Sequence, residues 1–148
     1  LAVIIGRMCK DVPREKVADV IFGYTCANDV TARDLQGPDK QWARAKGFDS
    51  FCPLGPWIET ELNPADAIIT CRVNGILRQM SSTRDMLFNV DQIILFASSI
   101  MTLNPGDVIL TGTPAGVGSL QAGDEISIFI DGIGSLVNPV IAGKAYEA

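Results

Sequence analysis

Short apolar segments that end at turn-forming residues recur along this chain and limit it to a fold built mainly from β-strands. Residues 67–73 alternate in polarity up to Asn74-Gly75, which is followed by a second apolar stretch, residues 76–80. An Asn-Gly pair between two such segments is the strongest local signal for a β-hairpin. Residues 126–130 run in the same way into Asp131-Gly132, which predicts a second hairpin.

Helical patterns are few. A short helix is expected after Pro13, and Asn89 with Gln92 predicts a capped helix start that leads through about Met101. The residues expected on its buried face are Ile93, Ile94, Phe96, Ala97 and Ile100. A parallel sheet of the Rossmann kind requires helices between successive strands, so the pattern predicts a mainly β, mixed α+β fold instead.

Residues 24–30 are predicted to form a strand, and residues 34–56 a long loop with repeated Gly and Pro. Loops of this length are normally functional or disordered. The aromatic side chains in and beside this one are expected to pack and so argue against disorder; they are Trp42, Phe48, Phe51 and Trp57. We therefore expect an ordered loop that builds a site.

The composition excludes several classes of protein. The chain has 148 residues, 47% of them hydrophobic, which predicts a single soluble globular domain. Its net charge is -5, and the basic residues are scattered along the sequence. No continuous positive surface for nucleic acid is expected. The longest apolar run, residues 93–101, is far shorter than the roughly 20 residues of a membrane span.

Histidine is absent, which excludes a Ser-His-Asp or Cys-His triad within the chain. Metal chemistry would then depend on carboxylates and carbonyls, which favour Mg²⁺, Mn²⁺ or Ca²⁺. Four separated cysteines without a C-x-x-C pair predict reduced, mostly buried thiols.

Three stretches are unusually rich in groups that could support chemistry. In residues 28–36, Asp29 at a strand exit could bind metal or simply cap the following backbone. Lys46 could be solvated, or could lose water between Trp42 and Phe48 and serve as an electrophile or base. Residues 110–118 form either a cradle for a small anion or a tight turn, and they lack a phosphate-loop pattern.

Taken in order, several motifs resemble the fumarylacetoacetate hydrolase family over nearly the whole chain. The motifs are GYTCANDVTARDLQ, WARAKGFDSFCPLGPWI, VNGILRQ, LNPGDVILTGTPAGVG and GDEISIFIDGIG. The resemblance implies a rolled, multi-sheet catalytic fold with few short helices. It also implies a cytoplasmic homodimer that acts on small 2-oxo acids with Mg²⁺ or Mn²⁺, with neither nucleic acid nor membrane as partner.

The resemblance also implies roles for individual residues. Asp29 matches a metal-binding aspartate, and Lys46 matches a catalytic lysine that stabilises developing negative charge. Arg33 and Gln36 match residues that position the substrate. Gly112 and Thr113 match a loop that contacts the substrate carboxylate.

One part of the family pattern is missing. Family members place two glutamate metal ligands, spaced E-x-E, just before the strand that begins here at Leu1, and some carry a histidine and a glutamate on an N-terminal lid. We therefore expect residues 1–148 to be a single catalytic domain truncated at its N-terminus. Such a domain alone would hold one of three protein ligands.

The mechanism implied by the resemblance is stabilisation of an enolate of a metal-bound 2-oxo acid. The expected reactions are C–C hydrolysis of acylpyruvates or isomerisation of 2-hydroxydienoates, in the breakdown of aromatic compounds. Oxaloacetate decarboxylation is the alternative within enzymes. A non-catalytic binding or assembly domain with a relic site is the alternative of another class.

Overall fold

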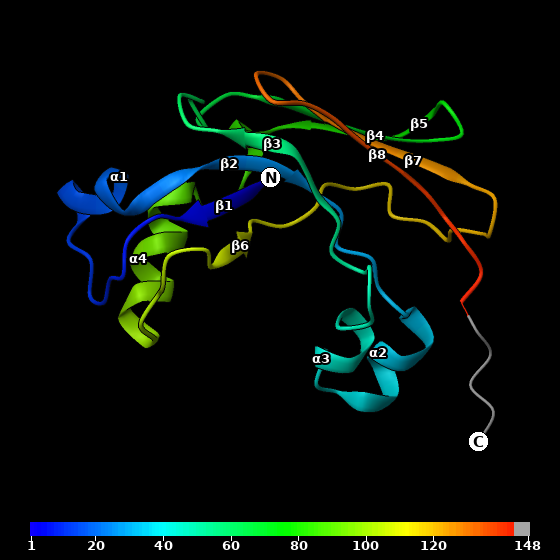
Figure 1. Ribbon diagram of the computed structural model, residues 1–148, viewed down its shortest axis with the longest axis horizontal. Coiled ribbons are helices and arrows are strands. Elements are labelled where there is room, and N and C mark those ends of the chain that lie inside the picture. The colour runs from blue at the N-terminus through cyan, green and yellow to red at the C-terminus, as the bar shows by residue number, and fades with distance from the viewer. Residues whose placement is uncertain (144–148) are drawn as a thin grey trace.

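The computed structural model describes residues 1–143 and shows two antiparallel four-stranded sheets (Figure 1). The first sheet has the order β3-β2-β1-β6 and the second has the order β5-β4-β7-β8. The strands are β1 (Ala2–Ile5), β2 (Ile21–Ala27), β3 (Leu54–Glu59), β4 (Ile68–Val73), β5 (Ile76–Ser82), β6 (Val108–Leu110), β7 (Glu125–Ile130) and β8 (Gly134–Pro139). The helices are α1 (Val17–Val20), α2 (Arg33–Asp39), α3 (Ala43–Lys46) and α4 (Val90–Ile100), with 3₁₀ turns η1 (Arg14–Lys16) and η2 (Thr83–Asp85). The predicted mainly β fold with few short helices is confirmed.

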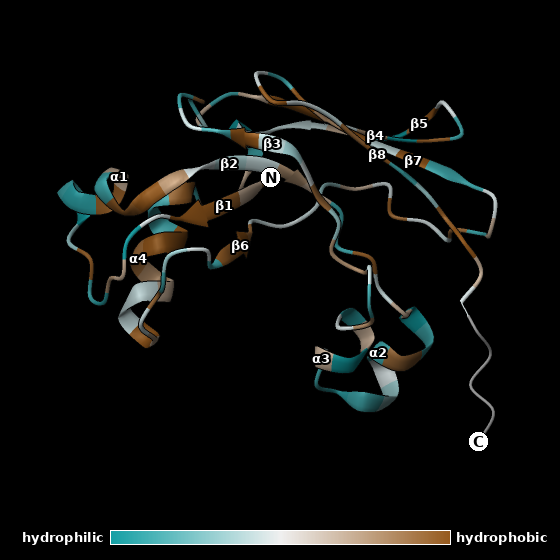
Figure 2. Ribbon diagram, viewed as in Figure 1, coloured by the Kyte–Doolittle hydropathy of each residue, from teal (hydrophilic) through white to brown (hydrophobic). Residues whose placement is uncertain are grey.

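Strand β1 lies at the centre of the hydrophobic core. All four of its residues are buried, with exposures between 0% and 7%. Successive side chains of a strand point to opposite faces of its sheet, so both faces of β1 must be covered. Figure 1 shows β1 between β2 and β6 in the first sheet, and Figure 2 shows that β1 is hydrophobic along its length. Val3 and Ile5, which point to the same face of β1, share one core cluster with β7 and with Ile94 of α4.

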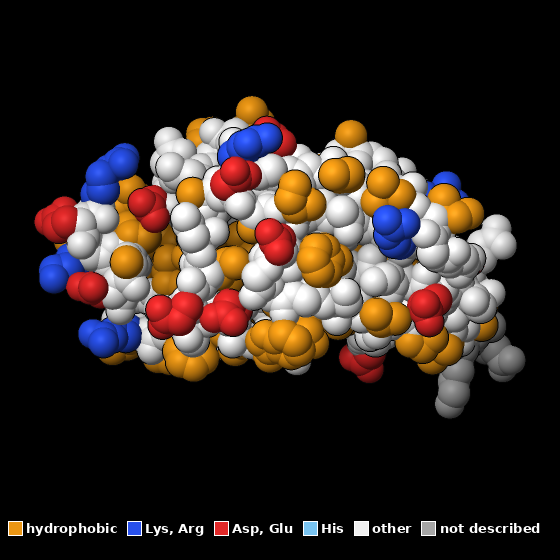
Figure 3. Space-filling model, turned by 90° about the horizontal axis from the view of Figure 1, so that it is seen from above, with side chains coloured by type: hydrophobic (Ala, Val, Ile, Leu, Met, Phe, Trp, Pro, Cys, Tyr) orange, Lys and Arg blue, Asp and Glu red, His pale blue; other side chains and the backbone are white. Residues whose placement is uncertain are grey.

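The second sheet buries one of its two faces. Ile126, Ile128 and Ile130 of β7 are buried, whereas Phe129 between them is 39% exposed. This alternation is the period of two expected of a half-buried strand. Seen from above, the molecule shows many hydrophobic side chains among charged ones (Figure 3). The inner face therefore builds the core, and apolar groups also remain on the outside.

Both predicted hairpins are present. Asn74 and Gly75 join β4 to β5 with φ of 51° and 77°, and positive φ at both central residues is what a type I′ turn requires. The Asn74 amide also donates to Asp124 Oδ1 at 2.8 Å and accepts from the Glu125 N–H at 2.9 Å. The first hairpin is thereby attached to the start of β7, which pairs with β8 in the second.

The predicted strand at residues 24–30 is displaced by three residues. Strand β2 begins at Ile21, because the preceding helix ends at Val20, and it ends at Ala27. Beyond it, the N–H groups of Asn28 and Val30 still donate to the carbonyls of Pro53 and Phe51, at 3.2 and 3.0 Å. The extended pairing thus continues irregularly to the polar residues of the strand exit.

The predicted loop at residues 34–56 contains two short helices. Pro38 lies in the last turn of α2, which ends where Lys40 takes a φ of 57°, so the Gly and Pro residues here end helices rather than exclude them. Phe48 and Phe51 pack on each other with ring centroids 5.2 Å apart. Trp42 and Trp57 are more than half exposed, so these two side chains are less buried than expected, although the Trp57 ring lies close to Gly134.

Helix α4 begins at the predicted cap, but its buried face differs from the prediction. The Asn89 side chain accepts from the Gln92 N–H, and the Gln92 side chain accepts from the Asn89 N–H, both at 2.9 Å. The buried residues are Val90, Ile94 and Ser98, one turn apart, while Phe96 and Ile100 are exposed. The helix is apolar on several sides, so periodicity alone could not select the side that meets the core.

The four cysteines are free thiols, as predicted, but burial is less complete than expected. Cys26 is buried, Cys9 and Cys71 are half-buried, and Cys52 is exposed. Burial raises the pKa of the Cys26 and Cys71 thiols, which keeps them in the neutral, weakly nucleophilic form. Among residues 1–143, no helix has the length and apolar character needed to cross a membrane.

Two substitutions in α4 test its orientation. Ile94→Ala removes a side chain that is 0% exposed and should lower the free energy of unfolding by about 2–5 kcal/mol. Phe96→Ala, at a position 69% exposed, should change it by only about 0.5 kcal/mol. Urea denaturation followed by circular dichroism measures both values. Equal destabilisation by the two variants would contradict the orientation described.

Candidate functional site

The structure brings Asp29 and Lys46 together. Asp29 follows β2 on the irregular pairing with residues 51–53, and Lys46 is the last residue of α3. Lys46 Nζ donates to Asp29 Oδ2 at 2.5 Å and to Thr31 Oγ1 at 3.1 Å, and Thr31 donates to the Asp29 carbonyl at 3.2 Å. The three residues thus form one polar cluster, although they lie 17 positions apart at most.

This cluster is partly open to solvent. The side chains of Lys46 and Asp29 are 30% and 44% exposed. Of the two alternatives that the sequence left open for Lys46, the structure does not support loss of water between Trp42 and Phe48. Those two side chains are 56% and 45% exposed, and Asp29 is the partner of the ammonium. An accessible lysine beside a carboxylate can meet an anionic ligand from solution.

The α2–α3 unit presents the other polar residues of the strand exit. Arg33 donates through a guanidinium N–H to Gln36 Oε1 at 2.5 Å, which leaves further N–H groups for a ligand. Arg44 on α3 forms a two-point ion pair with Asp39 at the end of α2, and this pairing holds the pKa of the Asp39 carboxyl below its usual range. The Ala32 N–H also donates to the Ala45 carbonyl at 2.8 Å. These contacts connect Arg33 and Gln36 to the segment that carries Lys46.

The loop after β6 holds Gly112 and Thr113 against the second sheet. Thr111 donates its hydroxyl to the Leu1 carbonyl at 3.1 Å, which fastens the loop to β1. The Gln79 amide nitrogen of β5 donates to Thr113 Oγ1 at 2.8 Å and to the Pro114 carbonyl at 2.7 Å. Thr113 itself is exposed.

A cavity of about 330 Å³ opens beside this loop. Its wall includes Gly112 and Thr113, the end of β5 and the segment after it, and apolar side chains such as Phe88 and Ile93. A mixed apolar and hydroxyl lining of this size suits a small organic ligand. Asp29, Arg33, Gln36 and Lys46 do not line it.

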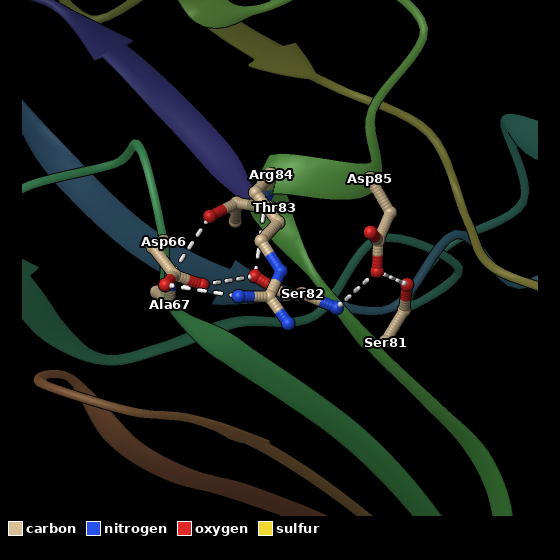
Figure 4. Close-up of polar contacts among 7 residues, drawn as sticks. All are labelled: Asp66, Ala67, Ser81, Ser82, Thr83, Arg84 and Asp85. Atoms are coloured by element: carbon tan, nitrogen blue, oxygen red, sulfur yellow. Dashed lines mark hydrogen bonds and ion pairs between the residues drawn. The ribbon is translucent and has the colours of Figure 1, made fainter.

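Hydrogen bonds within and beside η2 shape one wall of the cavity (Figure 4). Asp85 accepts from the Ser82 N–H at 3.2 Å and from the Ser81 hydroxyl at 3.1 Å, and the Ser82 hydroxyl donates to Asp66 at 2.6 Å. The Ser82-x-x-Asp85 spacing resembles a capping box and could have predicted this turn from sequence. Gln79 carries no such local signal, since its partners lie 34 and 35 residues away.

The described residues do not by themselves complete a site for a divalent cation. Within residues 1–143, no group of three or more Asp, Glu, Cys or His side chains is placed to hold a metal ion. The carboxylate of Asp29 and the oxygen atoms around it are the donors that Mg²⁺ and Mn²⁺ prefer, but one carboxylate is too few for firm binding. Lys46 moreover donates to Asp29 Oδ2, so its ammonium competes with a cation for that carboxylate.

A family comparison covers almost the entire chain. The model of the fumarylacetoacetate hydrolase C-terminal domain matches residues 1–141. Among solved structures, a 5-carboxymethyl-2-hydroxymuconate delta-isomerase from Mycobacterium smegmatis superposes with a TM-score of 0.94 at 55% identity, over 97% of this chain and 57% of that one. A maleylpyruvate hydrolase from Sphingobium sp. SYK-6, in complex with manganese(II) and pyruvate, gives 0.88 at 43% identity, over 97% and 53%.

Sequence comparison also finds a relative that is named for a different reaction. An oxaloacetate tautomerase of mitochondria from Xenopus laevis is 46% identical over 95% of this chain and 48% of its own length. The chain spans about half to two thirds of the length of the relatives that it matches. What those relatives do as whole proteins therefore applies to this chain only as a proposal.

Substitutions at two glycines test how closely the loop that carries Thr113 packs against β5. A Cβ on Gly116, which has a φ of 103°, would lie 2.0 Å from the Arg78 carbonyl oxygen, whereas one on Gly118 would have no neighbour within 4 Å. Gly116→Ala should therefore lower the free energy of unfolding by about 2 kcal/mol or more, and Gly118→Ala by about 0.5 kcal/mol at most. Thermal and urea denaturation measure the difference. A Gly116→Ala protein as stable as its Gly118→Ala control would disprove the close approach of the loop to β5.

Proposed function

This chain belongs to the fumarylacetoacetate hydrolase family, and from that premise we propose that it is the catalytic domain of an enzyme that acts on small 2-oxo acids through an enolate. The observation that supports this most directly is the Lys46–Asp29 contact, which pairs a cation with a carboxylate at a solvent-accessible strand exit. A fixed ammonium group lowers the energy of negative charge that develops on a nearby oxygen. Lys46 is assigned this role.

The remaining residues bind and orient the substrate. Thr113 and the backbone of Gly112, at the cavity wall, receive its carboxylate. Arg33 and Gln36 are linked to each other and can reach polar oxygens of the ligand with their other hydrogen-bonding atoms. The binding of remote carboxylate and oxo groups places the reacting bond, which is how such contacts accelerate a reaction.

We assign Asp29 as one ligand of a divalent cation, Mg²⁺ or Mn²⁺. The oxygen donors around Asp29 and the manganese(II) in the maleylpyruvate hydrolase relative support the assignment. The two further glutamate ligands that the family resemblance implies are not among the described residues. Such a cation, when bound, would supply Lewis-acid chemistry at the 2-oxo group.

The favoured reactions are C–C hydrolysis of an acylpyruvate and isomerisation of a 2-hydroxydienoate, within the breakdown of aromatic compounds. The names of the isomerase and hydrolase relatives support this reading. A second candidate is keto–enol conversion of oxaloacetate, which the tautomerase relative favours. It requires the same enolate. A cytoplasmic homodimer remains part of the proposal.

The reaction can be identified by an ultraviolet assay of the full-length natural gene product with Mg²⁺. The panel consists of an acylpyruvate, a 2-hydroxydienoate and oxaloacetate, with decarboxylation of oxaloacetate followed separately. Turnover of one of them, abolished by a chelator, is the expected result. Absence of turnover together with absence of oxalate binding in the presence of Mg²⁺ would favour the non-catalytic binding or assembly domain.

Two isosteric or near-isosteric substitutions test the assigned residues. Asp29→Asn and Lys46→Met should each lower kcat/KM by about 100-fold or more, because each removes a charge that contacts the reacting groups or their cation. Asp49→Asn and Lys40→Met make the same chemical changes at exposed positions of the same segment and should stay within about threefold of wild type. Circular dichroism establishes that all four variants fold. Unchanged kcat/KM in Asp29→Asn or Lys46→Met would exclude the proposed mechanism.

Metal titration of residues 1–148 alone tests the incomplete ligand set. With a single carboxylate at the site, the Kd for Mg²⁺ should be about 1 mM or weaker, because Mg²⁺ gives up its water reluctantly. Lys46→Met should strengthen binding, since it removes an ammonium that competes for Asp29. Isothermal titration calorimetry measures both constants. Micromolar binding by the unsubstituted chain would contradict the assignment of further ligands outside these residues.

A further inference from the structure

Gln79 connects strand β5 to the loop that carries Thr113. Its side-chain nitrogen lies 2.8 Å from Thr113 Oγ1 and 2.7 Å from the carbonyl oxygen of Pro114. Gln79 is half-buried, whereas Thr113 is exposed at the wall of the 330 Å³ cavity. Gln79 itself does not line the cavity, so it can act on a ligand there only through the loop.

The two contacts determine which way the Gln79 amide faces. The oxygen and nitrogen of a glutamine amide have nearly the same shape, so their assignment must come from their partners. A carbonyl oxygen such as that of Pro114 can only accept a hydrogen bond, and the amide atom beside it must therefore be the NH₂ nitrogen. The same nitrogen contacts Thr113 Oγ1, so the threonine hydroxyl is the acceptor in that contact.

Because Gln79 donates in this hydrogen bond, the Thr113 hydroxyl proton must point elsewhere. A threonine hydroxyl has one proton and two lone pairs, and here a lone pair is taken by Gln79. Within the part of the chain that the structure describes, the Thr113 hydroxyl donates to no acceptor. Thr111 differs, because its hydroxyl donates to the Leu1 carbonyl. Of the two threonines in this loop, Thr113 is the one whose proton is available to a ligand.

We propose that Gln79 is a positioning residue for substrate binding: its amide accepts nothing from Thr113 and so commits the Thr113 hydroxyl to donate to the carboxylate of the 2-oxo acid. The proposal rests on the function proposed above. Two further contacts keep the loop close to β5, so that the Gln79–Thr113 hydrogen bond is maintained. They are the hydrogen bond from Gln79 to the Pro114 carbonyl and the close approach of Gly116 to Arg78. Gln79 touches neither substrate nor reacting atoms.

Replacement of Gln79 should act on binding more than on chemistry. Gln79→Met removes the donor and lets the Thr113 hydroxyl rotate, while Gln79→Glu presents an acceptor that takes the Thr113 proton and places a negative charge near the substrate carboxylate. The carboxylate is bound equally in the ground and transition states, so KM should rise while kcat changes little. We expect about a tenfold higher KM for Gln79→Met, the factor of one hydrogen bond to a charged group, and a larger rise for Gln79→Glu.

The test measures kcat and KM of the full-length gene product for the 2-oxo acid that wild type converts, and the Kd of pyruvate by calorimetry with Mn²⁺ present. Gln121→Met and Gln121→Glu are matched controls, because Gln121 is exposed in a turn and has no assigned role. The expected result is a raised KM and pyruvate Kd for both Gln79 variants, with Glu more severe than Met, kcat within about threefold of wild type, and unchanged controls.

Each other outcome counts against the positioning role. Equal losses in the Met and Glu variants, or a fall in kcat with constant KM, would show that Gln79 only stabilises the fold. Wild-type constants in both Gln79 variants would overturn the inference and leave the proposed function intact. A wild-type protein that neither converts a member of the substrate panel nor binds pyruvate would overturn the proposed function and this inference with it.

Discussion

Complete burial of β1 is the constraint on which the rest of the structure depends. Its four apolar residues are buried, Val3 and Ile5 in one cluster with β7 and α4, while β2 and β6 take its backbone hydrogen bonds. A strand buried on both faces contributes hydrophobic stabilisation from every residue. It also determines where β2 and β6 must lie, and the two candidate site segments follow those strands.

The site segments leave the core in different ways. After β2, backbone hydrogen bonds from Asn28 and Val30 to the chain before β3 extend the pairing, and the α2–α3 unit projects from that stem (Figure 1). After β6, the chain is held to β1 by Thr111 and to β5 by Gln79. The first segment carries two short helices and the second is irregular backbone, and both connect strands of a rigid sheet, which is the usual location of functional groups in a protein.

Charge and hydrogen-bond polarity in these segments are complementary to an anionic ligand. Lys46 supplies a positive charge that is accessible to solvent, and Thr113 supplies a hydroxyl proton directed by its neighbour. Asp29 keeps Lys46 in place and reduces its net attraction for anions until a cation competes for the carboxylate. A small 2-oxo acid presents both the carboxylate and the oxo group that such an arrangement can bind.

The sequence by itself determined the hairpin at Asn74-Gly75, the cap of α4 and the family, because each depends on residues close together in the chain or on motifs in a fixed order. It also located Asp29, Lys46 and Thr113 as candidates. Only the tertiary structure decided which side of α4 is buried, that Lys46 meets Asp29 rather than aromatic rings, and that Gln79 forms a hydrogen bond with Thr113. Those outcomes depend on contacts between distant segments, and local sequence patterns do not encode the distance or direction of such contacts.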